Sequence, residues 1–151
     1  MTTKLEDQTE VLQHRMVALI RALGLHQTDK TLCGQPVSPS EAHALAELAQ
    51  AHVLGQRELT ERLRLQKSTV SRLVAGLLER GWATRSGDER DGRAARLMLT
   101  DAGREAAEQL AASRATKFAA VLEAVPPTRR RDVLDALDIL TTALEGSNAD
   151  D

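Results

Sequence analysis

The stretch that decides the fold is residues 54–103, which read LGQRELTERLRLQKSTVSRLVAGLLERGWATRSGDERDGRAARLMLTDAG. Its leucine spacing predicts a short helix over residues 56–63, followed by a tight turn at Arg64 and Leu65. A second helix is predicted over residues 67–80, and its apolar residues share one face: Val70, Leu73, Val74, Leu77 and Leu78. Two short helices joined by a tight turn form a helix-turn-helix unit.

Local signals mark both ends of the second helix. Gln66 is the predicted N-cap, and Leu65 and Val70 can pack around it as a hydrophobic staple. Gly81 suits the left-handed position after the last turn, and Trp82 can fold back as its hydrophobic partner.

A β-hairpin is predicted directly after the second helix. Two strand-like segments, WATR at residues 82–85 and AARLMLT at residues 94–100, flank the charged, turn-rich loop SGDERDGR. The hairpin over residues 82–100 would form a wing, so the central stretch predicts a winged helix-turn-helix lobe.

Helices are predicted on both sides of this lobe. An amphipathic pattern covers residues 5–23, and Ser38 begins a helix with a capping box. The predicted buried face of that helix comprises Ala42, Leu45, Leu48 and Ala49. Thr100 caps a long helix, and Thr128 begins a last helix that should end at Gly146. The predicted fold class is therefore mostly α.

Composition agrees with one helical domain. The chain has 151 residues, 42% hydrophobic and 28% charged, and it contains 23 alanines and 23 leucines. No uncharged apolar run approaches the roughly 18 residues of a membrane span. The first ten residues, MTTKLEDQTE, lack the order of a signal peptide. We therefore expect no membrane association and a cytoplasmic location.

The charge is segregated along the chain. Residues 57–96 hold ten basic and six acidic side chains, which gives a charge of +4. The rest of the chain holds ten basic and sixteen acidic side chains, which gives a charge of −6. The two parts sum to the net charge of −2. A basic centre between acidic ends is typical of a protein that presents one face to a polyanion. Ordinary variation of charge on helical surfaces explains the difference about equally well.

The exposed face of the second helix carries groups suited to reading DNA. A helix fits the major groove, and the residues at its N-terminal end reach the base edges. That face offers short hydroxyls and one guanidinium: Ser68, Thr69, Ser71 and Arg72. Lys67 and Arg64 lie where a phosphate would pass, and Arg90 and Arg93 of the wing can enter a narrow minor groove. Double-stranded DNA is the predicted partner.

Three motifs in this stretch also occur together in a known family. They are STVSR at residues 68–72, DERDGR at residues 88–93 and LMLT at residues 97–100. In this order they resemble the recognition helix, wing and strand end of the MarR family of bacterial transcriptional regulators. The resemblance is strong over residues 54–103 and extends in layout over nearly the whole chain.

The resemblance implies an organisation for the whole chain. Members of the family are homodimers whose terminal helices interlock. Residues 1–151 would then be a single MarR-like domain, with dimerisation helices at 1–36 and 104–146. The winged helix-turn-helix lobe would cover residues 38–103, with its hairpin wing at residues 82–100.

The resemblance also implies DNA contacts. Recognition contacts fall on Gln66, Ser68, Thr69, Ser71 and Arg72, and wing contacts on Arg90 and Arg93. Two positions depart from the family pattern. Gln66 stands where Asp or Ser often caps the recognition helix, and Ala94 replaces a second consecutive wing arginine.

The preferred functional hypothesis is a dimeric repressor of nearby genes. It would bind a palindromic operator and be released by a phenolic or aromatic-acid effector, which must favour one arrangement of the two recognition helices. The effector is expected where the terminal helices meet the lobe. Arg21, His43 and His52 are the nearest candidates to hold it, although each is more often a surface or core residue.

Several alternatives remain open at this point. Cys33 is the one cysteine and could make the regulator redox-responsive, whereas the four histidines could make it metal-responsive. A winged lobe can also bind protein instead of DNA. An enzyme such as a small hydrolase is a further class. No nucleophile elbow, glycine-rich phosphate loop or paired-carboxylate motif supports it. We therefore expect no catalytic site, no metal site and no cofactor.

Overall fold

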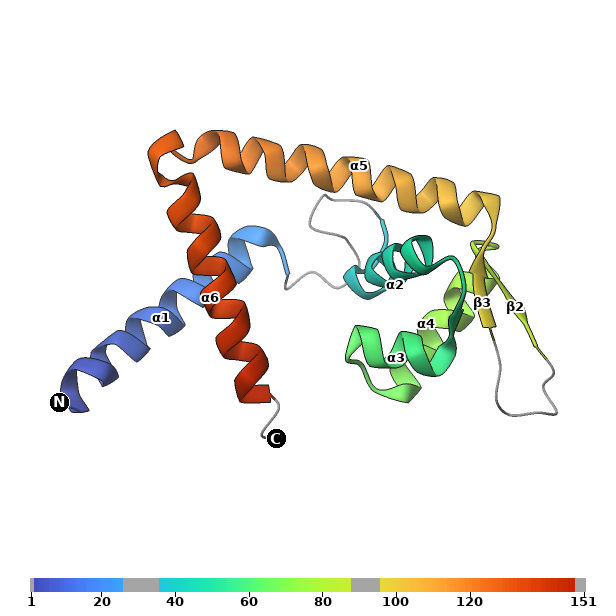
Figure 1. Ribbon diagram of the computed structural model, residues 1–151, viewed down its shortest axis with the longest axis horizontal. Helices are drawn as coiled ribbons and strands as arrows, with labels where there is room; N and C mark the ends of the chain where they lie inside the picture. Colours follow the sequence, from blue (N-terminus) through green and yellow to red (C-terminus); the bar gives the residue numbers. More distant parts are fainter. Residues whose placement is uncertain (1, 26–35, 88–95, 149–151) are drawn as a thin grey trace. The chain divides into compact units, whose positions relative to one another are not determined.

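The computed structural model describes residues 2–25, 36–87 and 96–148 (Figure 1). Its elements in chain order are α1 (Thr2–Leu23), α2 (Pro39–Ala51), β1 (Leu54–Gly55), α3 (Gln56–Leu63), α4 (Lys67–Glu79), β2 (Ala83–Ser86), β3 (Arg96–Leu99), α5 (Asp101–Ala124), the 3₁₀ turn η2 (Pro127–Arg129) and α6 (Arg130–Asn148). The fold is mostly α, as predicted, with one small antiparallel sheet.

The helix boundaries follow from local chemistry. At α2, the Ser38 hydroxyl accepts a hydrogen bond from the Glu41 amide at 3.2 Å, and the Glu41 carboxylate accepts one from the Ser38 amide at 3.1 Å. The predicted capping box is thus confirmed. Thr100 caps α5 as predicted, because its Oγ1 accepts a hydrogen bond from the Gly103 amide at 3.0 Å.

The chain divides into two compact units, residues 1–114 and residues 115–151, and α5 crosses the boundary between them. In the second unit, the Arg130 Nε donates hydrogen bonds to the carbonyls of Leu122 and Val125, at 3.0 and 3.2 Å, and so caps the end of α5. The last helix, α6, continues two residues beyond the predicted end at Gly146.

One hydrophobic core lies within the first unit. Fifteen residues form it: Val37, Ala44, Leu45, Leu48, Leu54, Leu59, Val70, Leu73, Val74, Leu77, Ala83, Leu97, Leu99, Ala107 and Leu110. We call the part of the unit that this core holds together, α2 to β3 with the start of α5, the winged lobe. No described residue of α1 or α6 is fully buried.

The predicted buried face of α2 needs a correction. Leu45 and Leu48 are buried as expected, but Ala42 and Ala49 are only half-buried, and Ala44 is fully buried instead. The cause is that α2 packs against α3, α4 and β3, so its contact surface extends further round the helix than one stripe.

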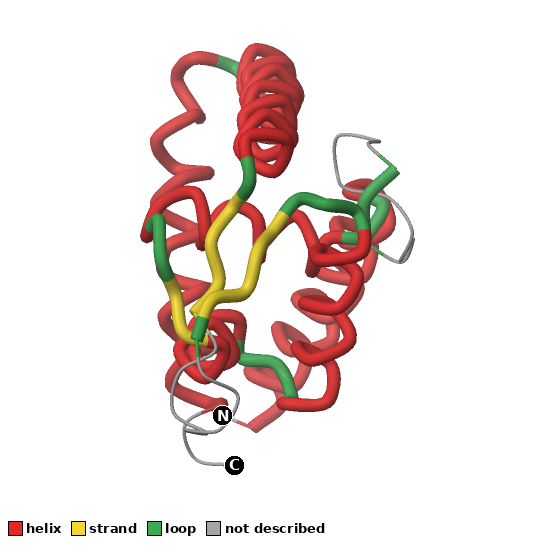
Figure 2. The backbone as a smooth tube through the Cα atoms, turned by 90° about the vertical axis from the view of Figure 1, so that its right-hand side faces the viewer, coloured by secondary structure: helices red, strands yellow, loops and turns green. Residues whose placement is uncertain are grey.

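The sheet has three strands in the order β1–β3–β2, all antiparallel (Figure 2). The predicted hairpin supplies two of them, with Ala83 opposite Leu99 and Arg85 opposite Leu97. The third, β1, is two residues long and places Leu54 opposite Leu97. The sequence did not predict it, because two residues carry no alternating pattern.

Among the described residues, no helix combines the length and the apolar character that crossing a membrane requires.

Candidate nucleic-acid interface

The turn between α3 and α4 sets the direction of the second helix. Arg64 ends α3 in the left-handed conformation, with φ 53° and ψ 38°. Gln66 is the N-cap of α4 in extended conformation, as predicted, but its side chain makes no capping hydrogen bond. The first backbone amides of α4 therefore receive no capping hydrogen bond from the Gln66 side chain. These amides lie at the N-terminal end of the helix, where the helix dipole makes the electrostatic potential most positive.

The two faces of α4 are sharply different. Val70, Leu73, Val74 and Leu77 are buried in the core and fix the helix against the lobe, while Leu78 is half-buried. The opposite face carries the side chains predicted to contact DNA: Gln66, Lys67, Ser68, Ser71 and Arg72 are exposed, and Thr69 is half-buried. The structure thus brings these six predicted residues together within the first two turns of one helix.

The end of α4 closes in a Schellman motif. The Gly81 amide donates to the Leu78 carbonyl and the Trp82 amide to the Leu77 carbonyl, both at 3.0 Å, with Gly81 at φ 72°. The Arg80 guanidinium lies over the Trp82 ring, 4.8 Å from its centroid. The predicted glycine stop is confirmed, and it holds the C-terminal end of α4 against β2.

Charged pairs tie α2 to the helix-turn-helix. The Arg62 guanidinium of α3 bonds the Glu47 carboxylate of α2 at 3.1 Å and the Glu58 carboxylate at 3.2 Å. The hydrogen bond to Glu47 is the main cause that raises the pKa of Arg62 above its ordinary value. Arg80 at the end of α4 reaches Glu41 of α2 at 3.7 Å. These pairs link α2 to α3 and to the end of α4.

A polar contact that the sequence analysis missed lies beside the exposed face of α4. Gln56 Nε2 donates to Ser71 Oγ at 3.2 Å, and Arg85 Nη2 donates to Gln56 Oε1 at 3.1 Å. The two bonds join residues 15 and 29 positions apart in the chain. No local pattern could have indicated them, because they depend on how α3, α4 and β2 pack.

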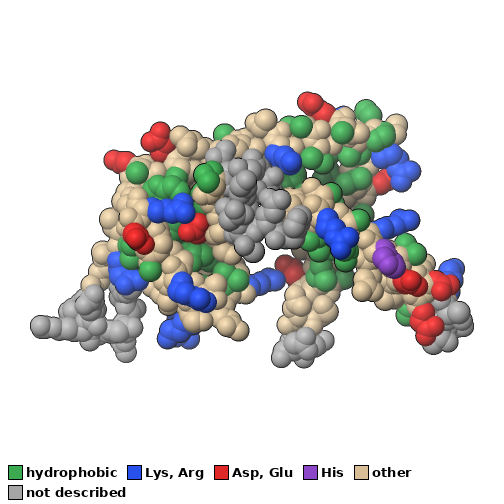
Figure 3. Space-filling model, turned by 180° about the vertical axis from the view of Figure 1, so that it is seen from behind, with side chains coloured by type: hydrophobic (Ala, Val, Ile, Leu, Met, Phe, Trp, Pro, Cys, Tyr) green, Lys and Arg blue, Asp and Glu red, His purple; other side chains and the backbone are tan. Residues whose placement is uncertain are grey.

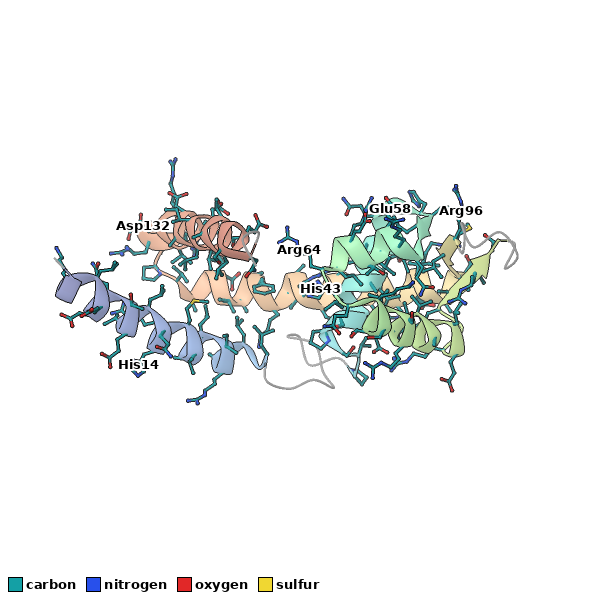
Figure 4. The ribbon with its side chains drawn as sticks, turned by 90° about the horizontal axis from the view of Figure 1, so that it is seen from below. His14, His43, Glu58, Arg64, Arg96 and Asp132 are labelled. Atoms are coloured by element: carbon teal, nitrogen blue, oxygen red, sulfur yellow. The ribbon has the colours of Figure 1, made fainter. Side chains whose placement is uncertain are left out.

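Positive charge is present around this face. Figure 3 shows several Lys and Arg side chains on the winged lobe. Arg85 on β2 and Arg96 on β3 are exposed, and Figure 4 labels Arg96 at the edge of the lobe. The predicted wing contacts, Arg90 and Arg93, lie outside the described residues.

The two candidate effector histidines line different hollows, and Arg21 lies on another helix. Arg21 is exposed near the end of α1. His43, labelled in Figure 4, lines a hollow of about 210 Å³ with Glu47 and Arg62. His52 ends α2 and lines a different hollow, of about 150 Å³. The two histidines therefore face separate hollows of the lobe.

Two of the alternative hypotheses name specific sites, a metal site and Cys33. No cluster of three or more potential metal ligands occurs within residues 2–25, 36–87 and 96–148. Cys33 lies outside the described residues.

One family model matches the central part of the chain. Residues 35–94 match the model of the MarR family. No curated protein matches the chain significantly.

Solved structures share the fold over nearly the whole chain. A probable transcriptional regulator from Pseudomonas aeruginosa is 24% identical, with TM-score 0.67 over 90% of this chain and 98% of its own. FabT from Streptococcus pneumoniae, solved in complex with DNA, is 18% identical, with TM-score 0.74 over 92% and 98%. BpsR from Bordetella bronchiseptica, whose DNA binding is regulated by 6-hydroxynicotinic acid, is 18% identical, with TM-score 0.67 over 89% and 98%. At these identities the likeness shows the fold.

Proposed function

We propose that the chain is a DNA-binding transcriptional regulator of the MarR family rather than an enzyme, and that it acts as a homodimeric repressor of nearby genes. The observation that carries the proposal is the exposed polar face of α4. The opposite, apolar face of the same helix is buried in the core and holds α4 in place. We propose that it is located in the cytoplasm, where a bacterial regulator binds chromosomal DNA.

The contacts we propose with DNA follow the positions of the side chains on α4. Ser68, Ser71 and Arg72 project from its first two turns, where a helix lying in the major groove reaches base edges. Gln66 and Thr69 complete this recognition surface, and Lys67 contacts phosphate. Arg90 and Arg93 of the wing add phosphate or minor-groove contacts. FabT, which has this fold, was solved in complex with DNA, and this supports the proposal.

Exposed apolar residues support the homodimer. The helix α6 exposes 52% of Leu134, 45% of Leu137 and 52% of Leu144, and α1 exposes 68% of Leu5. Several large apolar side chains exposed along one helix, as on α6, typically mark a protein–protein interface. A second copy of the chain is the occupant we propose, so that 1–36 and 104–146 serve as dimerisation helices and 38–103 as the DNA-binding lobe.

Release from DNA by a small phenolic or aromatic acid is the regulatory part of the proposal. BpsR, which shares the fold, is regulated by 6-hydroxynicotinic acid, a heteroaromatic acid of this size. Arg21, His43 and His52 are separate candidate anchors for such a carboxylate, because His43 and His52 line different hollows. A ligand of this kind releases DNA only if it binds one arrangement of the dimer better than the other.

The DNA contact is tested by replacing Arg72 and measuring fluorescence anisotropy with DNA from upstream of the protein's own gene. Arg72→Ala should weaken specific binding by about 1–3 kcal/mol and reduce the preference over scrambled DNA. Arg131→Ala is the matched control, because Arg131 on α6 is 92% exposed and its loss removes the same charge. Equal binding of both fragments by wild type and Arg72→Ala would refute the recognition surface.

The wing and the effector need separate measurements. Replacing Arg90 and Arg93 together should lower the salt dependence of binding by about one unit of slope per lost phosphate contact. Salicylate at millimolar concentration should release DNA from the wild-type protein, and it should release a smaller fraction of the bound DNA from His43→Ala. If salicylate and related acids release nothing, the effector class is wrong, although DNA binding stands.

A further inference from the structure

We infer that Gln56 is a positioning residue that fixes the Ser71 hydroxyl as a hydrogen-bond donor toward DNA and thereby helps to set base preference. The inference rests on the proposed function, because Ser71 is one of the proposed base contacts. We call Arg85, Gln56 and Ser71 together the Gln56 bridge.

The geometry of the Gln56 bridge joins three elements through one side chain. Gln56 is the first residue of α3 and is half-buried, so its side chain has less freedom than a fully exposed one. Its Nε2 donates to Ser71 Oγ on α4 at 3.2 Å, and its Oε1 accepts from Arg85 Nη2 on β2 at 3.1 Å. Its backbone carbonyl accepts from Thr60 Oγ1 at 2.8 Å.

The chemistry of the three groups fixes which group donates and which accepts in each hydrogen bond. A guanidinium can donate hydrogen bonds but cannot accept them, so the amide oxygen of Gln56 must face Arg85. The amide nitrogen therefore faces Ser71, whose oxygen accepts. The single hydroxyl proton of Ser71 is then left to point away from Gln56, and Ser71 is exposed.

A serine held in this state prefers one class of base edge. In the major groove guanine offers acceptors at N7 and O6, whereas cytosine offers only the N4 amino donor. A free serine hydroxyl could serve either class, because it both donates and accepts. The Gln56 bridge occupies one of the two lone pairs of the Ser71 oxygen and leaves its proton free, so Ser71 should favour an acceptor such as guanine O6 or N7 over the amino group of cytosine.

The test is to select DNA from a random pool with the full chain and to sequence what is bound. Ser71→Ala first identifies the base position at which Ser71 acts. Gln56→Ala should reduce the preference at that position about three- to tenfold, the range for loss of one hydrogen bond, and leave other positions unchanged. Arg85→Lys is the conservative variant, because an ammonium also only donates and should preserve the preference.

Gln56→Glu gives the sharper readout. A carboxylate still pairs with Arg85 but cannot donate, so the Ser71 proton turns toward Glu and its oxygen presents lone pairs to the base. The preferred base at that position should change to one that offers a donor, such as cytosine. The added negative charge weakens binding to all sequences alike and does not produce this change.

Two results would overturn the inference. The first is that Gln56→Ala and Gln56→Glu select the same bases as wild type with the same strength. The second is that both weaken every position equally, as expected if Gln56 only supports the fold. If the wild-type chain itself enriches no sequence, the proposed function fails, and the role of the Gln56 bridge fails with it.

Discussion

The winged lobe and the terminal helices use their apolar residues in opposite ways. In the lobe, Leu45, Leu59 and Leu77 are completely buried in one shared core. In α6, by contrast, Ile139 is 69% exposed and no residue is buried. The helix α1 also lacks a buried residue among its described side chains. The difference indicates that the lobe completes its own core, and it supports the proposed dimer, in which a second chain covers the apolar surface of the terminal helices.

This contrast assigns separate tasks to the two regions. A lobe with its own core can present α4 as a rigid surface, because the backbone of α4 is held by four buried side chains. In the proposed dimer, the terminal helices would set the separation of two such lobes. A dimer reads two half-sites only if that separation matches the turn of the DNA helix.

The largest expected effect comes from deleting residues 128–151. Without α6 the dimer should be lost, and with it all specific DNA binding, because one lobe contacts only one half-site. Analytical ultracentrifugation measures the oligomeric state, and deletion of residues 149–151 alone is the control that leaves α6 intact. A truncated chain that sediments as a dimer would contradict the role given to α6.

The next effect separates a core leucine from an interface leucine. Leu59→Ala should cost about 2–5 kcal/mol of unfolding free energy, because Leu59 is completely buried. Its loss in Tm should be the same at every protein concentration. Leu137→Ala in α6, where Leu137 is 45% exposed, should instead lower Tm by an amount that depends on concentration. Thermal melts at several concentrations decide between the two behaviours, and identical concentration dependence in both variants would count against the contrast.

A glycine at the start of α5 offers a test within the lobe. A Cβ at Gly103 would lie 1.9 Å from the carbonyl oxygen of Trp82, which itself accepts a hydrogen bond from the Thr100 amide. Gly103→Ala must therefore move backbone and should cost about 1–3 kcal/mol or more in chemical denaturation. Gly146→Ala in α6 is the control, since its Cβ meets nothing within 4 Å and alanine favours the helix. Destabilisation by both substitutions alike would show that the close approach at Trp82 is not the cause.

The smallest effect concerns the capping box of α2. Ser38→Ala removes the hydroxyl that accepts from the Glu41 amide and should cost about 0.5–2 kcal/mol. Ser40→Ala, two residues further along the same helix, should cost less, because Ser40 is not the N-cap. Urea denaturation of the two variants measures the difference, and equal losses would mean that the cap contributes nothing measurable.

Much of the lobe could be predicted because its signals are local. The capping residues Ser38 and Thr100, the glycine stop at Gly81 and the apolar face of α4 each act within a few residues. What could not be predicted depends on packing. Strand β1 exists only because Leu54 pairs with Leu97, and Ala44 is buried only because α2 meets several elements at once.

The candidate site shows the same division. The exposed residues of α4 follow from helical spacing, so the sequence placed Ser71 and Arg72 on the outer face, and the structure has them exposed there. The partners of Ser71 do not follow from spacing, because Gln56 and Arg85 reach it from other elements. The DNA contacts themselves remain a prediction.

Selection of DNA from a random pool by the full-length protein, followed by sequencing, tests the central claim most directly. If two self-contained lobes are held by a dimer of terminal helices, the bound DNA should contain an inverted repeat. The centres of its half-sites should lie about 10 base pairs apart, one turn of the double helix. Enrichment of a single half-site without a repeat would contradict the dimer, and the absence of any enriched sequence would contradict DNA recognition by α4.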